Sequence, residues 1–316
     1  MRSSRKLFTL LIIIIFNLQA YGQGLPKQLQ KLALKPDYIE VINELEINLK
    51  GGHLQGLQGY HWQQEEYVYW SGSSDSYAYL VTGKLSNNIE TTRLHRLSEK
   101  PLKHAGGFQI YQNWLAIGVE DNEARDRSQV HIYQLNNPNE PLPAPVAVID
   151  RHGPFEKMTA GCVAVVQQEN ELLVAVGNWN TRNLDFYEAS LQGQDYDFIK
   201  TGAIEVAALS RKNWSDTTWR SYQNINFYQE EDQLYLLGFA SENPARDVMD
   251  IFSVETSEGH QYKLRKIGTR FFASSPETSF RWGAGIWIKD HSISVVSCTE
   301  KLKINSRISK YHLKTP

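Results

Sequence analysis

The sequence predicts an all-β fold, a single five-bladed β-propeller with four-stranded blades. The first observation is an internal repeat: His53-Leu54-Gln55-Gly56-Leu57-Gln58 and His104-Ala105-Gly106-Gly107-Phe108-Gln109 both read His-x-x-Gly-x-Gln. With weaker echoes downstream, the repeat gives anchors near residues 56, 107, 161, 224 and 283. The second observation is that an alternating run follows each anchor and ends at an aromatic residue, namely Tyr79, Tyr133, Tyr187, Phe252 and Tyr311. Four short strands repeating at this spacing are typical of propeller blades.

The N-terminus reads as a secretory signal peptide over residues 1–22. Arg2, Arg5 and Lys6 precede an apolar run from Leu7 to Phe16, and small residues follow it. This order is typical of an export signal, and the apolar run is shorter than the ~20 residues that span a bilayer. We therefore expect a periplasmic or extracellular protein with no membrane span after signal removal. Residues 23–36 read as a linker or short helix.

Residues 37–316 form the expected propeller domain. The second unit shows its four strands most clearly, over residues 108–112, 114–120, 129–135 and 146–149. The fifth unit ends one strand short, while a spare strand, Tyr38 to Leu49, precedes the first anchor. We expect this N-terminal strand to complete the last blade, because closure of the ring removes an unpaired edge.

Composition narrows the classes of partner. The 316 residues have a net charge of -2 and are 41% hydrophobic, as in a globular protein. A near-neutral charge gives no reason to expect nucleic acid. The two cysteines, Cys162 and Cys298, fall in non-neighbouring repeats, so we expect two buried free thiols rather than a disulfide.

The repeat predicts one binding face. The segments that enter the first strands of all blades open on the same face, because each antiparallel strand reverses the direction of the last. They bring His53, His104, Lys157, Arg220 and Arg281 to one channel mouth, with Gln58, Gln109 and Asn226 deeper in the channel. We predict a secreted binding or interaction module whose polar, cationic mouth takes a small anionic or hydroxyl-rich ligand, or a partner loop. The competing interpretation is that these side chains only hydrogen-bond neighbouring blades.

An enzyme is the alternative hypothesis. It would be a hydrolase or lyase that uses His53 and His104 as acid–base groups or as ligands of a divalent metal, with Asp121 as a third ligand. The sequence has no Gly-x-Ser-x-Gly, phosphate-loop or dinucleotide motif in a suitable context. We therefore assign no catalytic residue and no resident cofactor, and the prediction leans away from an enzyme.

The predicted blade count resembles that of the five-bladed glycosidases, the arabinanases and β-fructosidases. The resemblance implies catalytic carboxylates on the inner strands around the axis. The expected inner strands, residues 57–61, 108–112, 162–166, 225–228 and 286–289, contain no Asp or Glu. Because that chemistry requires paired carboxylates, the sequence predicts against a glycosidase of that kind. Among the tryptophans, Trp179 and Trp282 are expected nearest the mouth.

Overall fold

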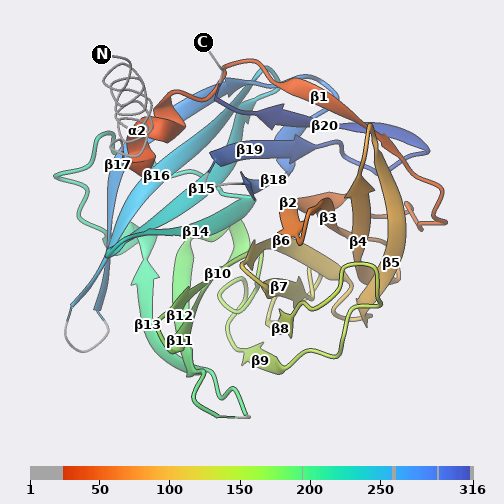
Figure 1. Ribbon diagram of the computed structural model, residues 1–316. Coiled ribbons are helices and arrows are strands. Elements are labelled where there is room, and N and C mark those ends of the chain that lie inside the picture. Colours follow the sequence, from red (N-terminus) through yellow and green to blue (C-terminus); the bar gives the residue numbers. More distant parts are fainter. Residues whose placement is uncertain (1–23, 194, 258–260, 290–291, 314–316) are drawn as a thin grey trace, which may run out of the picture.

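The computed structural model describes residues 24–193, 195–257, 261–289 and 292–313. The fold is all-β, and its twisted sheets lie side by side around a common centre (Figure 1). The expected signal peptide lies outside the described residues. Within them, no helix has the length and apolar character needed to cross a membrane.

The strands follow one another in runs along the chain. The first runs are β2 (Leu54–Trp62), β3 (Glu65–Ser73), β4 (Tyr77–Leu85) and β5 (Ile89–Glu99), then β6 (His104–Tyr111), β7 (Trp114–Glu120), β8 (Arg127–Gln134) and β9 (Ala147–His152). They continue with β10 (Cys162–Gln168), β11 (Glu171–Gly177), β12 (Asn183–Ser190) and β13 (Ile199–Glu205), then β14 (Asn224–Glu230), β15 (Gln233–Asn243), β16 (Arg246–Ser257) and β17 (Gln261–Ala273). The final strands are β18 (Ser279–Lys289), β19 (Ser292–Cys298) and β20 (Asn305–Tyr311).

Consecutive strands within each run pair antiparallel, as local hairpins do. The N-terminal strand β1 (Asp37–Ile42) pairs antiparallel with β20 along its whole length, from Asp37↔Lys310 to Ile42↔Asn305. The predicted pairing of the chain's first strand with its last run is therefore confirmed. Short parallel contacts, β1 with β5 and β6 with β10, join neighbouring runs into larger continuous sheets.

Buried amides join the innermost strands of different runs. Gln58 Nε2 donates to Asn226 Oδ1 at 3.0 Å, and Asn226 Oδ1 also accepts from Ile286 N at 3.1 Å. Gln109 Oε1 accepts from Val165 N at 3.0 Å and from Phe227 N at 2.8 Å. Because these amides are fully buried, they satisfy inner-strand groups that no neighbouring strand pairs.

The repeated glycines allow the inner strands to approach one another. A Cβ on Gly107 would lie 2.3 Å from the Gln223 carbonyl oxygen, and one on Gly56 would lie 2.6 Å from the Phe108 ring. Real Cβ atoms do not approach other atoms so closely. The repeated His-x-x-Gly-x-Gln pattern thus combines a close-packing glycine with an amide that links strands, Gln58 or Gln109.

The segment expected to be a linker or helix is part of the packed fold. It contains the short helix α2 (Leu25–Gln30), whose Leu25 and Leu29 are buried in a core cluster with residues of the fourth and fifth runs. The expected free thiols are confirmed: Cys162 and Cys298 are unpaired and buried. Burial raises the pKa of the Cys162 thiol to about 12, so it stays protonated at neutral pH.

A candidate active site at the channel mouth

Two histidines meet over one amide where β2 and β6 begin. The Nε2 atoms of His53 and His104 lie 3.4 Å and 3.0 Å from the amide nitrogen of Gln55. The two imidazole rings are 6.1 Å apart between centroids and nearly perpendicular. Both ring nitrogens therefore face the same small volume, which a single donor group occupies.

The other ring nitrogens determine which tautomer each histidine adopts. His53 Nδ1 lies 2.9 Å from the Leu54 carbonyl oxygen and donates to it, so its Nε2 has a free lone pair. His104 Nδ1 lies 3.2 Å from Glu120 Oε1. The two atoms are close enough for an ion pair, but neither has a hydrogen-bond partner. The Nε2 atom of His104 accepts from the Gln55 amide. The two Nε2 lone pairs converge.

Glu120 is a buried carboxylate behind His104. Only 1% of the residue is exposed, and its Oε2 accepts from the backbone N–H of Ala160 at 2.7 Å. A buried carboxylate is costly unless it has hydrogen bonds and an opposite charge. The His104 ring is the ionisable group that lies against Glu120, so it is the side chain that this carboxylate can position.

A β-bulge places Glu120, rather than Asp121, opposite His104. The β6–β7 register runs from Tyr111↔Trp114 to Phe108↔Ile117 and then shifts, so that His104 faces Glu120. The two residues between Ala105 and Phe108 oppose a single residue of β7, which is the definition of a bulge. An unbroken hairpin would have paired His104 with Asp121.

Asp121 therefore does not serve as a third ligand beside the histidines. Its Oδ1 accepts from the backbone N–H groups of Glu123 and Ala124 at 3.1 and 2.9 Å, and its Oδ2 pairs with Arg127 at 2.9 Å. The carboxylate holds the β7–β8 turn. Among the residues that the structure describes, no group of three or more His, Cys, Asp or Glu side chains is arranged to hold a metal ion.

Register shifts at the starts of β2 and β18 bring further side chains to the mouth. In β2 the shift lies between Leu54 and Gly56, so Gln55 is the extra residue. In β18 the shift between Ser279 and Ala284 displaces the segment that contains Arg281 and Trp282. Bulges re-aim side chains in this way. These shifts explain why the site also contains Arg281 and Trp282, which lie outside the repeated His-x-x-Gly-x-Gln motif.

Trp282 and Arg281 extend the site on the side of His53. The Trp282 ring meets the His53 ring edge-on at 5.5 Å between centroids, and the Arg281 guanidinium lies 4.9 Å from the centre of the Trp282 ring. Burial lowers the pKa of His53, and the positive charges of His104 and Arg281 lower it further; the Leu54 carbonyl and Glu300 act in the opposite direction. His53 is consequently neutral at neutral pH and available as a base.

Of the eight predicted ligand-binding residues, the structure brings His53, His104 and Arg281 together. Gln58, Gln109 and Asn226 are the buried amides that link inner strands, and Lys157 lies in an exposed loop 3.7 Å from Glu205. Gln55 and Glu120 also lie at this site, although neither was among the eight predicted ligand-binding residues. Gln55 belongs to the repeated motif, and Glu120 ends β7 on the face where the mouth was predicted.

Arg220 belongs to a buried ionic cluster under the fourth run instead. Its guanidinium lies 2.8 Å from Asp250 Oδ2, Lys266 Nζ lies 3.1 Å from the same oxygen, and Tyr222 OH donates to it at 2.6 Å. Asp250 and Lys266 are completely buried. The cluster anchors the segment between β13 and β14, and it leaves Arg220 without a free face toward the mouth.

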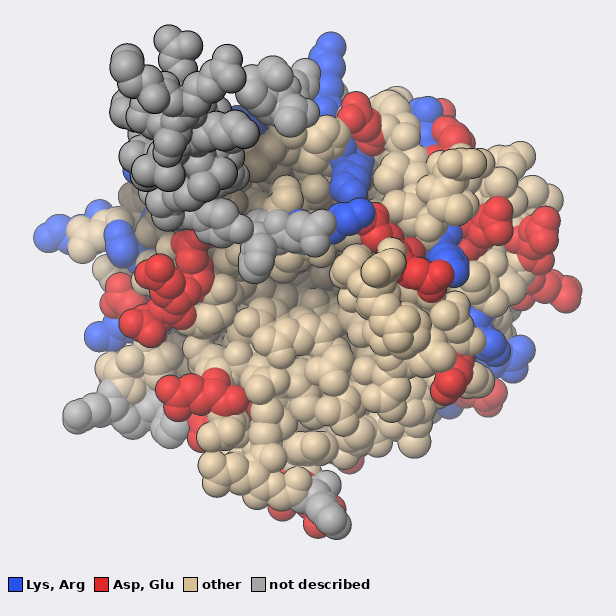
Figure 2. Space-filling view, viewed as in Figure 1, with Lys and Arg blue, Asp and Glu red and all other residues tan. Residues whose placement is uncertain are grey.

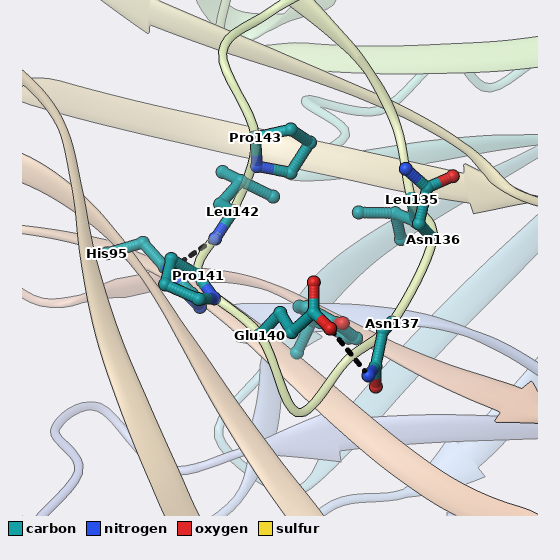
Figure 3. A pocket seen from close by; sticks show the side chains of 9 residues that line it. His95, Leu135, Asn136, Asn137, Glu140, Pro141, Leu142 and Pro143 are labelled. Carbon is teal, nitrogen blue, oxygen red and sulfur yellow. Dashed lines mark hydrogen bonds between the residues drawn. The ribbon is translucent and has the colours of Figure 1, made fainter.

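A small pocket elsewhere is too small for a sugar. The loop after β8 folds over β5 and encloses about 60 Å³ between His95, Tyr69 and residues 135–143 (Figure 3). Leu142 N–H donates to His95 Nδ1 at 3.2 Å and closes the loop against the sheet. Ligand pockets usually measure about 300 Å³ or more. This cavity is well below that size.

Charged side chains are mixed on the face of the molecule in Figure 2. Lys and Arg lie among Asp and Glu toward the rim of that view, and the middle of the face is mostly uncharged. No large surface of one sign is visible there. A charged ligand on this face would therefore be bound by individual side chains and not by a broad surface of one sign.

The comparisons with known proteins point to one architecture. No family model matches the sequence, and no curated protein matches it. The catalytic domain of a GH62 α-L-arabinofuranosidase from Coprinopsis cinerea aligns with a TM-score of 0.50 at 10% identity, over 88% of this chain and 97% of that one. A GH43_1 enzyme from Xanthomonas citri aligns with a TM-score of 0.49 in complexes with xylose and with xylotriose, at 9% and 10% identity, over 83% of this chain and 88% of that one.

The comparison does not support the predicted binding or interaction module, because the aligned arabinofuranosidase domain, at a TM-score of 0.50, is that of a glycoside hydrolase. A protein partner is likewise not supported. At such low identity the likeness shows the fold alone. The chain is a β-propeller.

Proposed function

We propose that the antiparallel runs are five four-stranded blades, with β1 as the outer strand of the last, and that the channel mouth is the active site of a hydrolase. The observation on which the proposal depends is the convergence of two Nε2 lone pairs on one small volume, with a buried carboxylate behind one of the rings. Paired acid–base groups in such a position are what bond hydrolysis needs.

A sugar is the substrate class that the site fits best. The enzymes with this fold named above include one complexed with xylose and xylotriose. In this chain the half-buried Trp282 ring lies beside His53, where an aromatic surface can pack against a sugar ring. The substrate would take the place of the Gln55 amide between the two imidazoles.

The two histidines have different environments and therefore different roles. His53 is desolvated and neutral, so its Nε2 accepts a proton from the attacking water. His104, supported by Glu120, is the acid: its Nε2–H donates to the glycosidic oxygen as that oxygen leaves the anomeric carbon. The water oxygen forms the new bond to carbon, and the proton returns from His53 to His104 through solvent.

The mechanism differs from the two-carboxylate mechanism of most glycosidases. In the described inner strands the one acid is Glu230, which lies at the end of β14 and accepts from the backbone N–H of Leu25 at 2.8 Å. It is therefore far along the channel from His104. A histidine base beside a single carboxylate also suits elimination, so a lyase is the second candidate.

Product analysis of purified protein with aryl xylosides, aryl arabinofuranosides and xylan oligosaccharides tests the proposal. Hydrolysis adds one water to the summed product mass, and elimination adds none. We expect His53→Ala and His104→Ala each to lower the cleavage rate by a factor of about 10² to 10⁴. Cleavage of all substrates at equal rates by the wild type and both variants would refute it.

His61→Ala is the matched control, because His61 is an exposed histidine at the other end of β2. It should leave cleavage unchanged. A chelator provides a separate control: if it abolishes the activity and added divalent metal restores it, the imidazoles act as metal ligands and the acid–base roles are wrong.

A further inference from the structure

Several cations in the loops on the face of the mouth are neutralised. Each of the following is paired with Asp or Glu: Arg125, Arg127, Lys157, Arg182, Arg220 and Arg246. These six side chains already have an acidic partner within the protein. They are therefore less available to bind an anionic ligand.

Arg281 differs from these residues. It is exposed, it stacks on Trp282 at 4.9 Å, and no Asp or Glu oxygen in the described part of the chain lies within 4.0 Å of its charged nitrogens. Its charge still reaches His53, as does the opposite charge of exposed Glu300. The guanidinium is held by the aromatic ring rather than by an acid, so its donors face solvent at the edge of the site.

We propose that Arg281 binds the anionic group of an acidic sugar and so makes this site selective for uronic-acid or sulfated sugars over neutral ones. The proposal rests on the proposed function, since it names the substrate class for the same site. A planar guanidinium matches the two oxygens of a carboxylate or sulfate. A sugar ring packed on Trp282 would place its carboxylate or sulfate group next to Arg281. The glycosidic bond of the same sugar would then lie toward His53.

Binding of sugars that differ at one carbon isolates this interaction. Glucuronate, glucose and glucose 6-sulfate share a ring and differ at C6. Titration calorimetry with the purified protein should show one anionic sugar binding about tenfold or more tighter than glucose, the effect of a charge-assisted hydrogen bond. The preference should shrink as salt is added, since the contact is exposed.

Arg281→Gln should abolish the preference, so that the variant binds glucuronate and glucose 6-sulfate no more tightly than it binds glucose. Arg246→Gln is the matched control: Arg246 is also exposed and also lies over an aromatic ring, Phe271 at 5.0 Å, but it is paired with Glu242. It should keep the preference. The exposure of both side chains predicts that both variants fold, which their unfolding midpoints check.

The outcomes separate the two proposals. Equal binding of all three sugars, or a preference that survives Arg281→Gln, refutes the role of Arg281 while leaving the hydrolase proposal intact if neutral glycosides are cleaved with dependence on His53 and His104. The absence of both binding and cleavage of every sugar would refute both. A preference for glucuronate alone, or for the sulfate alone, identifies the anionic group.

Discussion

Glu120→Gln changes one charge in the proposed active site with almost no change in volume. In the wild type, Oε2 accepts from Ala160 N–H and Oε1 faces His104 Nδ1. The glutamine oxygen can keep the bond to Ala160, so its NH₂ group must face His104. That group donates, and the ring must therefore accept at Nδ1 and carry its proton on Nε2. His104 then changes its tautomer and no longer lies against a carboxylate.

The expected loss of activity is large and the expected loss of stability is small. Misorienting a catalytic histidine in this way costs a factor of about 10² to 10⁴ in rate. Because the backbone bond is kept, Glu120→Gln should change the free energy of unfolding by less than about 1 kcal/mol. Glu120→Ala removes the acceptor of a buried N–H and should cost about 1–3 kcal/mol more. Urea unfolding and cleavage rates measure the two effects separately.

Glu123→Gln is the control for charge alone. Glu123 pairs with Lys103 on the same face, and its side chain is 75% exposed, so its substitution should change stability by only about 0–1 kcal/mol and leave the rate unchanged. If Glu120→Gln keeps the wild-type rate, His104 does not depend on the carboxylate. The acid–base assignment of the pair would then be wrong.

Three further predictions concern the fold. Asp250→Asn removes the carboxylate shared by a buried arginine and a buried lysine, so it should lower the free energy of unfolding in urea by about 3–5 kcal/mol. Glu242→Gln should lower it by only about 0–1 kcal/mol. Equal effects of the two substitutions would contradict the assignment of a buried ionic cluster. Burial raises the pKa of Asp247 to about 6. The folded state therefore retains a proton that the unfolded state loses as the pH rises from about 4 to 6. Over this range the contribution of Asp247 to the free energy of unfolding should fall by roughly 3 kcal/mol. Asp247→Asn should remove that decline, and identical pH profiles of stability would count against it. Gly107→Ala should cost about 1–3 kcal/mol through overlap with a backbone oxygen, while Gly161→Ala, whose nearest neighbour lies at 3.5 Å, should cost less; a reversed order of unfolding midpoints would show that the inner strands can move apart.

The repeat made much of the fold predictable. Hairpins are local, so alternating runs with turn residues at regular intervals predicted the antiparallel pairs within each run. The pairing of Asp37–Ile42 with β20 was also predictable, because the last run lacked a strand and the chain began with a spare one. The histidines of the repeated motif, His53 and His104, came together for the same reason: equivalent positions of adjacent repeats are neighbours in space.

The rest depended on tertiary structure. The β6–β7 bulge shifts the register by one residue and places Glu120, not Asp121, behind His104. Sequence spacing alone does not show such a shift, because it counts residues and not the pairs that they form. Ion pairing also depends on residues that are distant in the sequence. Asp250 neutralises Arg220, whereas in the described part of the chain Arg281 stacks on Trp282 and has no acidic partner. The sequence therefore determined which residues stand at the mouth's strand entries, and the packing of the blades determined which of them have a free functional group.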